Sequence, residues 1–505
     1  MQPELAARLD LRLVPAAVTA WTVTAAGIVW SIGAQLAAAC AIVAAGWAAL
    51  VWWRGAVNRV LRSAAVAVIG AATIGAGFGV AVALRDAAVR EHPIAHRFGT
   101  AGSLTVTPTE SPRSLGNGRL MFRADLNRLG EGEMSGRVVV FAPVLGFGEL
   151  SAGQPARFRA RIGRPTRRDL SVAVLTASGE PVLGQASAVQ RVAQTVRSRF
   201  AAAALQVLPA DQAAILPGLV LGDTSSVPPA MTAQFRTAGL THLTAVSGAN
   251  VTIVCGAVLL SARLVGPRPA VALAAVALVA FVVVVQPTAS VLRAAVMGAL
   301  ALLAVLAGRR RQAIPVLAAA VLALLVAAPQ LAVDAGFALS VSATAALVVL
   351  APMWSARLVA RGWPKALADA VCIALAAQVV TAPLVAAISG QLSLIAVLAN
   401  LAVALVIPPI TVLGTAAAAL CPLWAPGASV LIRFTGPELW WLLHVARWAS
   451  EVPGAAVTVP SGPAGLVVVG GVGVLVVVGV AGCRRGVTRS DRERDGGQSA
   501  SDPRR

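Results

Sequence analysis

Long apolar runs separated by short polar segments occupy most of the chain, and they predict membrane-spanning helices. A helix needs about 20 mostly apolar residues to cross the hydrocarbon core of a bilayer. A first group of runs opens the sequence, and a second group follows a long polar insert. We place the runs near residues 14–34, 36–53, 63–84, 240–262, 270–286, 291–307, 313–328, 335–353, 367–389, 394–420, 428–449 and 464–482.

The stretch 394–450 is the least regular part of this pattern. Pro408-Pro409 interrupts it, and its three tryptophans (Trp440, Trp441 and Trp448) suit an interfacial helix at least as well as a span. We therefore expect ten to twelve spans.

The polar insert, residues 85 to about 215, has a different period. Short β-rich or alternating runs recur at residues 104–107, 119–126, 136–141, 157–162 and 172–176, with turn signals between them. This spacing predicts a small β-barrel or sandwich. The runs would suit an OB-type barrel, although the alternation does not separate that fold from other small β folds. From Ser187 the pattern turns helical, with arginines beside apolar positions, and predicts an amphipathic helix at the membrane surface.

Composition settles the fold class. Apolar residues make up 58% of the chain and charged residues only 12%, against about 25% charged in soluble domains. Such a chain could not cover its own surface with polar groups, which excludes a soluble enzyme, a disulfide scaffold and a disordered protein. We predict a polytopic α-helical membrane protein with an inserted small extracellular β-barrel-like (OB-type) domain. Its segments are the N-terminal helices 1–84, the β domain 85–190, interfacial helices 191–237, a second membrane domain 238–482 and a disordered basic tail 483–505.

The distribution of arginine predicts how the chain crosses the membrane. The net charge is +20, and Lys365 is the only lysine. Arginines fill the loop 54–62 and the loop 309–311, whereas the loops around Pro287 and Gln330 carry no Arg or Lys. Because cytoplasmic loops collect positive charge, we place both termini in the cytoplasm and residues 85–215 outside. The arginine excess itself also fits a bias in base composition.

Several polar side chains interrupt the apolar runs. Thr241, Thr244, Ser247 and Asn250 are spaced three apart, and on a helix they form one slanted polar row. Polar groups at membrane depth face protein or water, since leaving them unpaired in lipid is costly. Hydrogen bonds between helices and a lined pathway explain this row equally well. Ser247-Gly248 also permits a local break.

Arg293 is the most informative of the remaining polar residues. A charged arginine at a helix centre costs about 2.5–3.5 kcal/mol on insertion scales, but a position one turn into the run would also let it snorkel to the surface. Asp334, Ser340, Gln378 and Asn400 lie in other runs. Residues 218–482 hold only five acids, which argues against an ordinary ion-coupled transporter. We find no catalytic motif, cofactor motif or metal-ligand set, and we expect His92 and His96 to be solvated loop residues.

The stretch 218–254 resembles the signature of the ComEC-type competence proteins, the inner-membrane channel of bacterial DNA uptake. The matching residues are Gly239, Leu240, His242, Leu243, Ala245, Ser247, Gly248 and Val251. Asn250 replaces the second histidine usual in that family. Further matches, in order along the chain, are Arg293-Ala294 with Met297, Asp334-x-Gly336-Phe337-x-Leu339-Ser340, and Asn400-Leu401.

This resemblance implies a plasma-membrane channel for single-stranded DNA rather than an enzyme. It implies that residues 85–190 form the family's extracellular OB-like domain and residues 200–480 its competence membrane domain. The β-lactamase-like domain of longer relatives is not expected here, so a separate nuclease would degrade one strand. Expected partners are the lipid bilayer, a helix-hairpin-helix DNA receptor and a cytoplasmic DNA-translocating ATPase.

The residues expected to matter fall into two sets. The expected DNA path comprises His242, Thr244, Ser247, Asn250, Arg293, Asp334, Ser340, Gln378 and Asn400. The arginines expected to gather DNA on the β domain are Arg119, Arg123, Arg157, Arg159 and Arg161. Two other functions stay open: a small-solute or lipid-linked permease on the same fold, and a non-transporting membrane anchor of a competence assembly.

Overall fold

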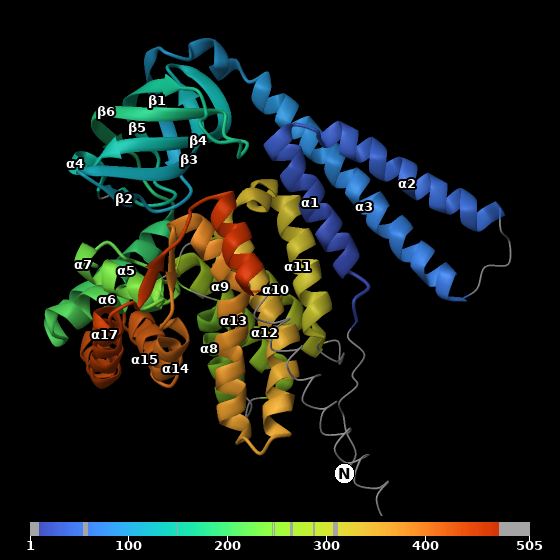
Figure 1. Ribbon diagram of the computed structural model, residues 1–505. Helices are drawn as coiled ribbons and strands as arrows, with labels where there is room; N and C mark the ends of the chain where they lie inside the picture. The colour runs from blue at the N-terminus through green and yellow to red at the C-terminus, as the bar shows by residue number, and fades with distance from the viewer. Residues whose placement is uncertain are drawn as a thin grey trace, which may run out of the picture.

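The computed structural model describes residues 10–53, 59–148, 150–244, 246, 248–262, 266–285, 288–306 and 312–473. The expected disordered tail 483–505, the arginine loop 309–311 and Ser247 lie outside these residues. A β-barrel sits at one end of a bundle of helices, and the loop between α12 (Ala335–Val359) and α13 (Lys365–Ser389) lies at the opposite end (Figure 1).

Three apolar helices open the chain as the pattern predicts: α1 (Val14–Trp30), α2 (Gly33–Trp53) and α3 (Arg59–Arg90). Small residues bring α2 and α3 together. A Cβ built on Gly79 of α3 would lie 2.9 Å from the Cβ and backbone nitrogen of Ala37 on α2. A Cβ at this distance would overlap Ala37. Glycine at position 79 therefore lets the two helix backbones approach closely, as small residues do in membrane helices. Helix α3 then continues to the barrel through the 3₁₀ turn η1 (Pro93–Arg97).

The insert folds as a closed five-stranded barrel. Its strands are β1 (Ala101–Pro108), β3 (Arg119–Leu129), β4 (Gly132–Pro143), β5 (Ala156–Gly163) and β6 (Ala173–Leu183), with the short β2 (Arg113–Gly116) on the edge of β3. The order is β1-β5-β6-β4-β3, and β3 pairs back with β1. The β4–β6 pair is parallel and the others are antiparallel. All five predicted strands are confirmed, whereas β2 was not predicted because its four residues are all exposed.

Alternation along the strands builds the barrel core. Successive strand residues point to opposite faces, and β5 shows this with buried Phe158 and Ala160 between exposed arginines. Phe122 of β3 and Phe147 of the short helix α4 (Val144–Phe147) complete the apolar interior. The barrel core is a separate cluster of buried residues from those of the helices.

The rest of the chain is helical. The elements are α5 (Ala188–Val207), α6 (Ala210–Leu221), α7 (Pro229–Thr237), η2 (Thr241–Leu243), α8 (Gly248–Ser261), α9 (Pro267–Val285), α10 (Ala289–Leu306), α11 (Ala313–Ala327), η4 (Pro329–Val333), α12, α13, α14 (Ala396–Val403), α15 (Ile407–Leu420), α16 (Ala425–Phe434) and α17 (Gly436–Glu451). The short strands β7 (Gln391–Ser393) and β8 (Ala456–Thr458) pair, and a last helix covers Pro463–Gly473.

Six of the described helices are long and apolar enough to cross a membrane: α2, α3, α9, α10, α12 and α13. Counting α14 and α15 as one span bent by 55° makes seven. The chain therefore has the character of a multi-pass membrane protein, but the expected ten to twelve spans are not shown. Several predicted runs form shorter helices: α1, α8 and α11 have 17, 14 and 15 residues. At 1.5 Å per residue, the last two rise only about 21–23 Å.

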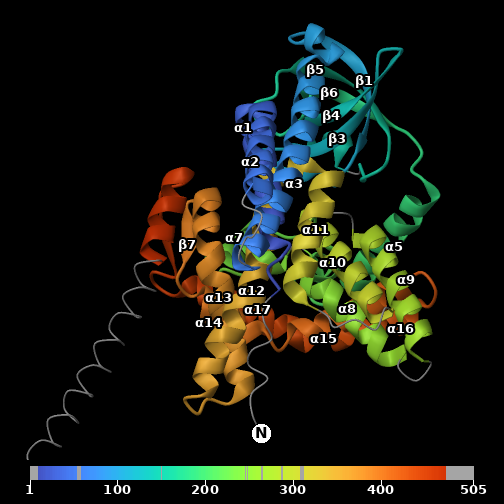
Figure 2. The ribbon, with the colours of Figure 1, turned by 90° about the vertical axis from the view of Figure 1, so that its right-hand side faces the viewer.

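Helix α17 does not follow the direction of the long helices. It is seen nearly end on in Figure 1, where α12 and α13 run along the view's vertical, and it lies across them in Figure 2. Trp440 and Trp448 on this helix are 51% and 56% exposed. This orientation favours the interfacial interpretation of the tryptophan-rich segment over a span.

Arginines cap the carboxyl ends of several apolar helices. Each guanidinium donates to a carbonyl in or just after the last turn: Arg168 to Val29 (3.0 Å), Arg85 to Val326 (3.3 Å), Arg197 to Val284 (2.8 Å) and Arg199 to Pro422 (3.2 Å). The last four carbonyls of a helix have no partner within it, and the helix end is negative. Because Arg168 belongs to the barrel, the end of α1 lies on the barrel's side of the bundle.

The segment predicted to be an amphipathic helix forms α5, and its location at a membrane surface stays a prediction. It begins at Ser187, whose hydroxyl accepts from the Gln190 backbone N–H, while the Gln190 side chain accepts from the Ser187 backbone. This capping box fixes the start of the helix. Its apolar face, with Val196 and Phe200, packs into the helical core.

We expect glycine-to-alanine substitutions to separate two environments on α3. Gly79→Ala would overpack the α2–α3 contact and destabilise the protein by about 1–3 kcal/mol. Gly77→Ala on the same helix would meet no atom within 4 Å and would be neutral or stabilising, since alanine favours helix by up to about 1 kcal/mol. Thermal unfolding in detergent measures both. Equal melting temperatures for the two variants would contradict this packing.

Candidate functional site

Residues 239–244, which precede α8, form no α-helix. Gly239 has a φ of +72°, η2 makes one 3₁₀ turn, and α8 begins only at Gly248. The Thr244 hydroxyl donates to the Thr241 carbonyl at 2.8 Å, a local bond that competes with regular structure. The predicted helix over 240–262 is therefore wrong in its first turns, and Thr241, Thr244 and Asn250 do not form one row on a single helix.

Arg293 of α10 is buried and points into the protein, so it does not snorkel. It is 6% exposed. Its Nε donates to Ser340 Oγ of α12 at 2.8 Å, and its Nη1 lies 3.1 Å from Met297 Sδ. Ser290 Oγ lies 3.1 Å from Ser340 Oγ and completes the group. Arg293 forms no ion pair within the described part of the chain.

The amino end of α8 lies against the Arg293 guanidinium. A Cβ on Gly248 would be 2.7 Å from Arg293 Nη2, so a larger residue there would displace the guanidinium. The first backbone N–H groups of a helix have no intrahelical partner and carry the positive end of the helix dipole. Two positive features thus meet in an apolar interior, an arrangement suited to an anion such as a phosphate.

Asn250 has a structural role that the sequence does not reveal. It is 5% exposed, and its Nδ2 donates to the Leu219 carbonyl at 2.9 Å. Leu219 lies in the last turn of α6, which ends at Gly222 in the left-handed conformation. The amide therefore caps α6 and joins it to α8. This role needs an N–H donor at position 250 and does not need an imidazole.

A second polar group surrounds the start of α14. Asn400 Nδ2 donates to the Ala396 carbonyl at 2.8 Å and to the Gly239 carbonyl at 3.4 Å. Gln378 Nε2 of α13 donates to the Ser393 carbonyl at 3.3 Å. The buried Ser393 hydroxyl has no hydrogen-bond partner among the described residues. Gly239 thus belongs to this group, whereas Gly248 of α8 belongs to the Arg293 group.

Asp334 and Arg123 connect the barrel with the helices. Asp334 is the N-cap of α12, where its Oδ1 accepts from the Phe337 backbone N–H at 2.8 Å. Its Oδ2 lies 3.7 Å from Arg123 Nη2 on β3, and Arg123 also pairs with Glu110 at 3.7 Å. Both residues are therefore engaged at the contact between the two parts. His242 of η2 is exposed.

Three of the five barrel arginines share one exposed face. Arg157, Arg159 and Arg161 alternate along β5 and are all exposed. Arg159 has a hydroxyl neighbour on both sides, Ser103 on β1 and Ser178 on β6. Arg157 lies between Thr105 and Val182, and Arg161 lies between Ala101 and Thr176. Arg157 Nε donates to Ser103 Oγ at 3.2 Å. Arg119 is exposed at the start of β3, two strands away from β5.

Arg137 on β4 differs from the exposed arginines of β5. Arg137 pairs across the ladder with Asp125. Burial lowers the pKa of Arg137 from its ordinary value, an effect that Asp125 opposes and Arg123 reinforces. The β3–β4 face therefore holds mixed charges, whereas the charged residues of β5 itself are all arginines.

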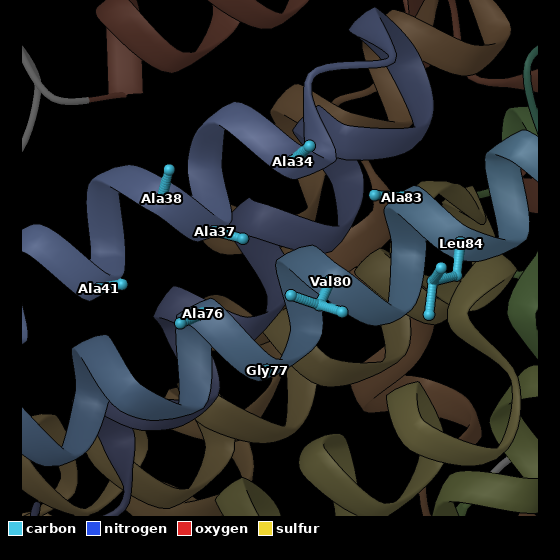
Figure 3. A pocket seen from close by; sticks show the side chains of 9 residues that line it. All are labelled: Ala34, Ala37, Ala38, Ala41, Ala76, Gly77, Val80, Ala83 and Leu84. Carbon is cyan, nitrogen blue, oxygen red and sulfur yellow. The ribbon is translucent and has the colours of Figure 1, made fainter.

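A pocket of about 650 Å³ lies between α2 and α3. Figure 3 shows the two helices side by side, with Ala34, Ala37 and Ala38 on one and Ala76, Val80 and Ala83 on the other. Its lining residues are all apolar, so this pocket offers nothing to solvate a charged polymer. In the part of the chain that the structure describes, no three His, Cys, Asp or Glu side chains form a metal-binding group.

Comparison with known proteins gives one match. The model of a protein family whose description is "Competence protein" matches residues 219–482, which include the non-helical segment and both polar groups. No curated protein matches the chain, and no solved structure matches it.

The capping role of Asn250 makes a sharp prediction. Asn250→Leu would leave a buried carbonyl without its donor and lower the free energy of unfolding by about 1–3 kcal/mol. Asn250→His keeps an N–H donor and should recover part of that loss. Thermal unfolding of the two variants in detergent measures the difference. If leucine and histidine destabilise the protein equally, the amide does not act as this cap.

Two substitutions separate the N-cap hydrogen bond of Asp334 from its ion pair with Arg123. Asp334→Asn keeps a good N-cap but loses the charge that pairs with Arg123, whereas Asp334→Ala loses both. We expect the alanine variant to be less stable than the asparagine variant by about 1 kcal/mol. Protease cleavage between barrel and helices should increase in both variants, and in Arg123→Gln. Unchanged cleavage in all three would mean that the ion pair does not hold the barrel in place.

Proposed function

The chain belongs to the competence protein family, and we propose that it conducts single-stranded DNA inward across the bacterial plasma membrane. The observation that carries this proposal is the buried Arg293, which lies beside Ser340 and the amino end of α8 and pairs with no described carboxylate. A buried cation without a counter-charge is costly. A passing anion would supply that charge transiently.

The chemistry of the cargo requires such groups. Every nucleotide carries a phosphate charge, which the hydrocarbon core does not solvate. Hydroxyls, helix ends and an arginine can replace the lost water at a narrow point, as in other membrane pathways. Ser290, Ser340, Arg293 and the amino end of α8 supply this combination. Irregular backbone in a membrane domain is either buried in protein or lines a water-filled cavity, and in this proposal residues 239–244 lie at the border of the pathway.

In this proposal the barrel is of OB type and gathers the strand outside the membrane. A closed five-stranded barrel with one parallel pair supports that assignment. The arginine row on β5 would bind phosphates without regard to sequence. A helix-hairpin-helix receptor would deliver DNA, a cytoplasmic ATPase would pull it, and a separate nuclease would remove the other strand. We propose no enzymatic step for this chain.

A DNA-uptake assay with labelled duplex, scoring single strands in the cytoplasm, tests the function. We expect Arg293→Gln to lower uptake about tenfold or more, because hydrogen bonds to charged groups contribute about 1.5–3 kcal/mol. Ser340→Ala should cause a smaller loss, because it removes the hydrogen bonds to Arg293 and Ser290 but leaves the guanidinium charge in place. Arg357→Gln is the matched control, because it removes an exposed arginine near the far end of α12.

The outcomes separate the three candidate functions. Normal uptake by Arg293→Gln at wild-type membrane levels, with loss on deletion of the chain, would overturn the conduit and favour a non-transporting anchor. Normal uptake in the deletion strain, together with transport of a small solute by reconstituted protein, would favour a permease.

A further inference from the structure

A pocket opens at the end of the arginine row on the barrel. Its volume is about 520 Å³, within the roughly 300–1,000 Å³ of small-molecule sites. Phe98, Arg161, Arg164 and Thr176 line it, together with Gly99 and Gly163. None of these is acidic, and the two glycines leave backbone groups uncovered. The pocket therefore combines an aromatic ring, two cations and a hydroxyl.

Three separate segments build this pocket. Phe98 follows η1 and packs against the barrel core, so its ring is held in place. Arg161 ends the exposed row of β5, and Arg164 begins the loop to β6. Two backbone bonds tie the Phe98 segment to β5: Gly99 N–H to the Ile162 carbonyl at 2.8 Å, and Ile162 N–H to the Thr100 carbonyl at 2.9 Å. These backbone bonds hold the segment that carries Phe98 beside the strand that carries Arg161.

The pocket continues the track formed by Arg157, Arg159 and Arg161. Alternate residues of a strand are about 6.6–6.8 Å apart, so the three arginines start from regularly spaced positions on one face. Ser103, Thr105, Thr176 and Ser178 lie beside parts of this row. The row therefore offers successive cation positions to a phosphodiester backbone.

We propose that the pocket binds one nucleotide of single-stranded DNA, with its base against Phe98 and its phosphate between Arg161 and Arg164. The backbone on one side of that nucleotide then follows the β5 row. Thr176 faces the same pocket and offers a hydroxyl to the nucleotide. The identity of the polymer rests on the proposed function, whereas the site rests on the pocket and its lining.

An aromatic ring beside arginines is the general arrangement for sequence-tolerant binding of single strands, because every base has a face that stacks. A paired base has no free face, so duplex DNA would use the arginines alone. The pocket therefore gives the barrel a preference for single strands, which charge by itself does not give.

The test measures binding of a short fluorescent oligothymidylate to the full chain in phosphatidylcholine nanodiscs. Phe98→Leu keeps apolar packing but removes the ring, and it should weaken binding about 5- to 100-fold, the range for loss of one base stack. Arg161→Gln should weaken binding and reduce the slope of log K against log salt by about 0.7, the value for one phosphate contact on a single strand. Arg167→Gln, an exposed arginine in the same loop but outside the pocket, should change binding by less than about twofold.

Two further probes define the site. An abasic oligonucleotide should bind the wild-type chain as weakly as oligothymidylate binds Phe98→Leu, and the ring should not affect binding of duplex DNA of equal length. If Phe98→Leu lowers the melting temperature, its binding does not separate lost stacking from unfolding. Arg161→Gln then tests the site. The proposal is overturned if Arg161→Gln and Arg167→Gln weaken binding equally, or if anionic vesicles instead of oligothymidylate show the dependence on Phe98 and Arg161.

This result is independent of the uptake experiment. If the pocket variants bind normally while Arg293→Gln still loses uptake, the pocket is wrong and the conduit stands. If the pocket variants lose binding while Arg293→Gln takes up DNA normally, the site stands and the conduit is wrong.

Discussion

Carbonyl groups at the ends of apolar helices must find hydrogen-bond donors within the protein, and long polar side chains supply them here. Arg85, Arg168, Arg197 and Arg199 donate to helix-end carbonyls, and Asn250 does so inside the domain. Each of these bonds joins segments far apart in the chain. The caps therefore also fix how the helices, α5 and the barrel lie relative to one another, because each guanidinium reaches from one element to the end of another.

Arg293 differs from these arginines in a way that matters for function. The capping arginines donate to helix-end carbonyls, and Arg85, Arg168 and Arg199 among them are exposed. Arg293 is buried against Ser340, Met297 and the start of α8, none of which is negative. Glycine at position 248 permits the approach, and the non-helical segment before it permits α8 to begin there. The helix is interrupted before Gly248, and the glycine lets the guanidinium approach. Together these two features produce an electropositive interior.

The barrel and this interior are connected through α12. Arg123 of β3 pairs with Asp334, the N-cap of α12, and Ser340 lies further along the same helix against Arg293. The first half of α12 therefore contacts both the barrel and the Arg293 group. Arg123 is paired with Asp334 and Glu110, whereas the exposed arginines of β5 take part in no ion pair among the described residues.

The sequence by itself determined the apolar helices, the five barrel strands and the start of α5 at Ser187, because each depends on a local period or a cap within a few residues. It also determined that β5 presents its arginines on one face. The pair Ser247-Gly248 also indicated a possible break, and α8 does begin at Gly248. Only the tertiary structure decided that Arg123 pairs with Asp334 rather than staying free, and that Asn250 caps α6. These outcomes depend on partners that lie from 31 to more than 200 residues away, and no local period contains them. The same holds for the pocket at Phe98, whose ring and arginines come from separate segments that only the closed barrel brings together.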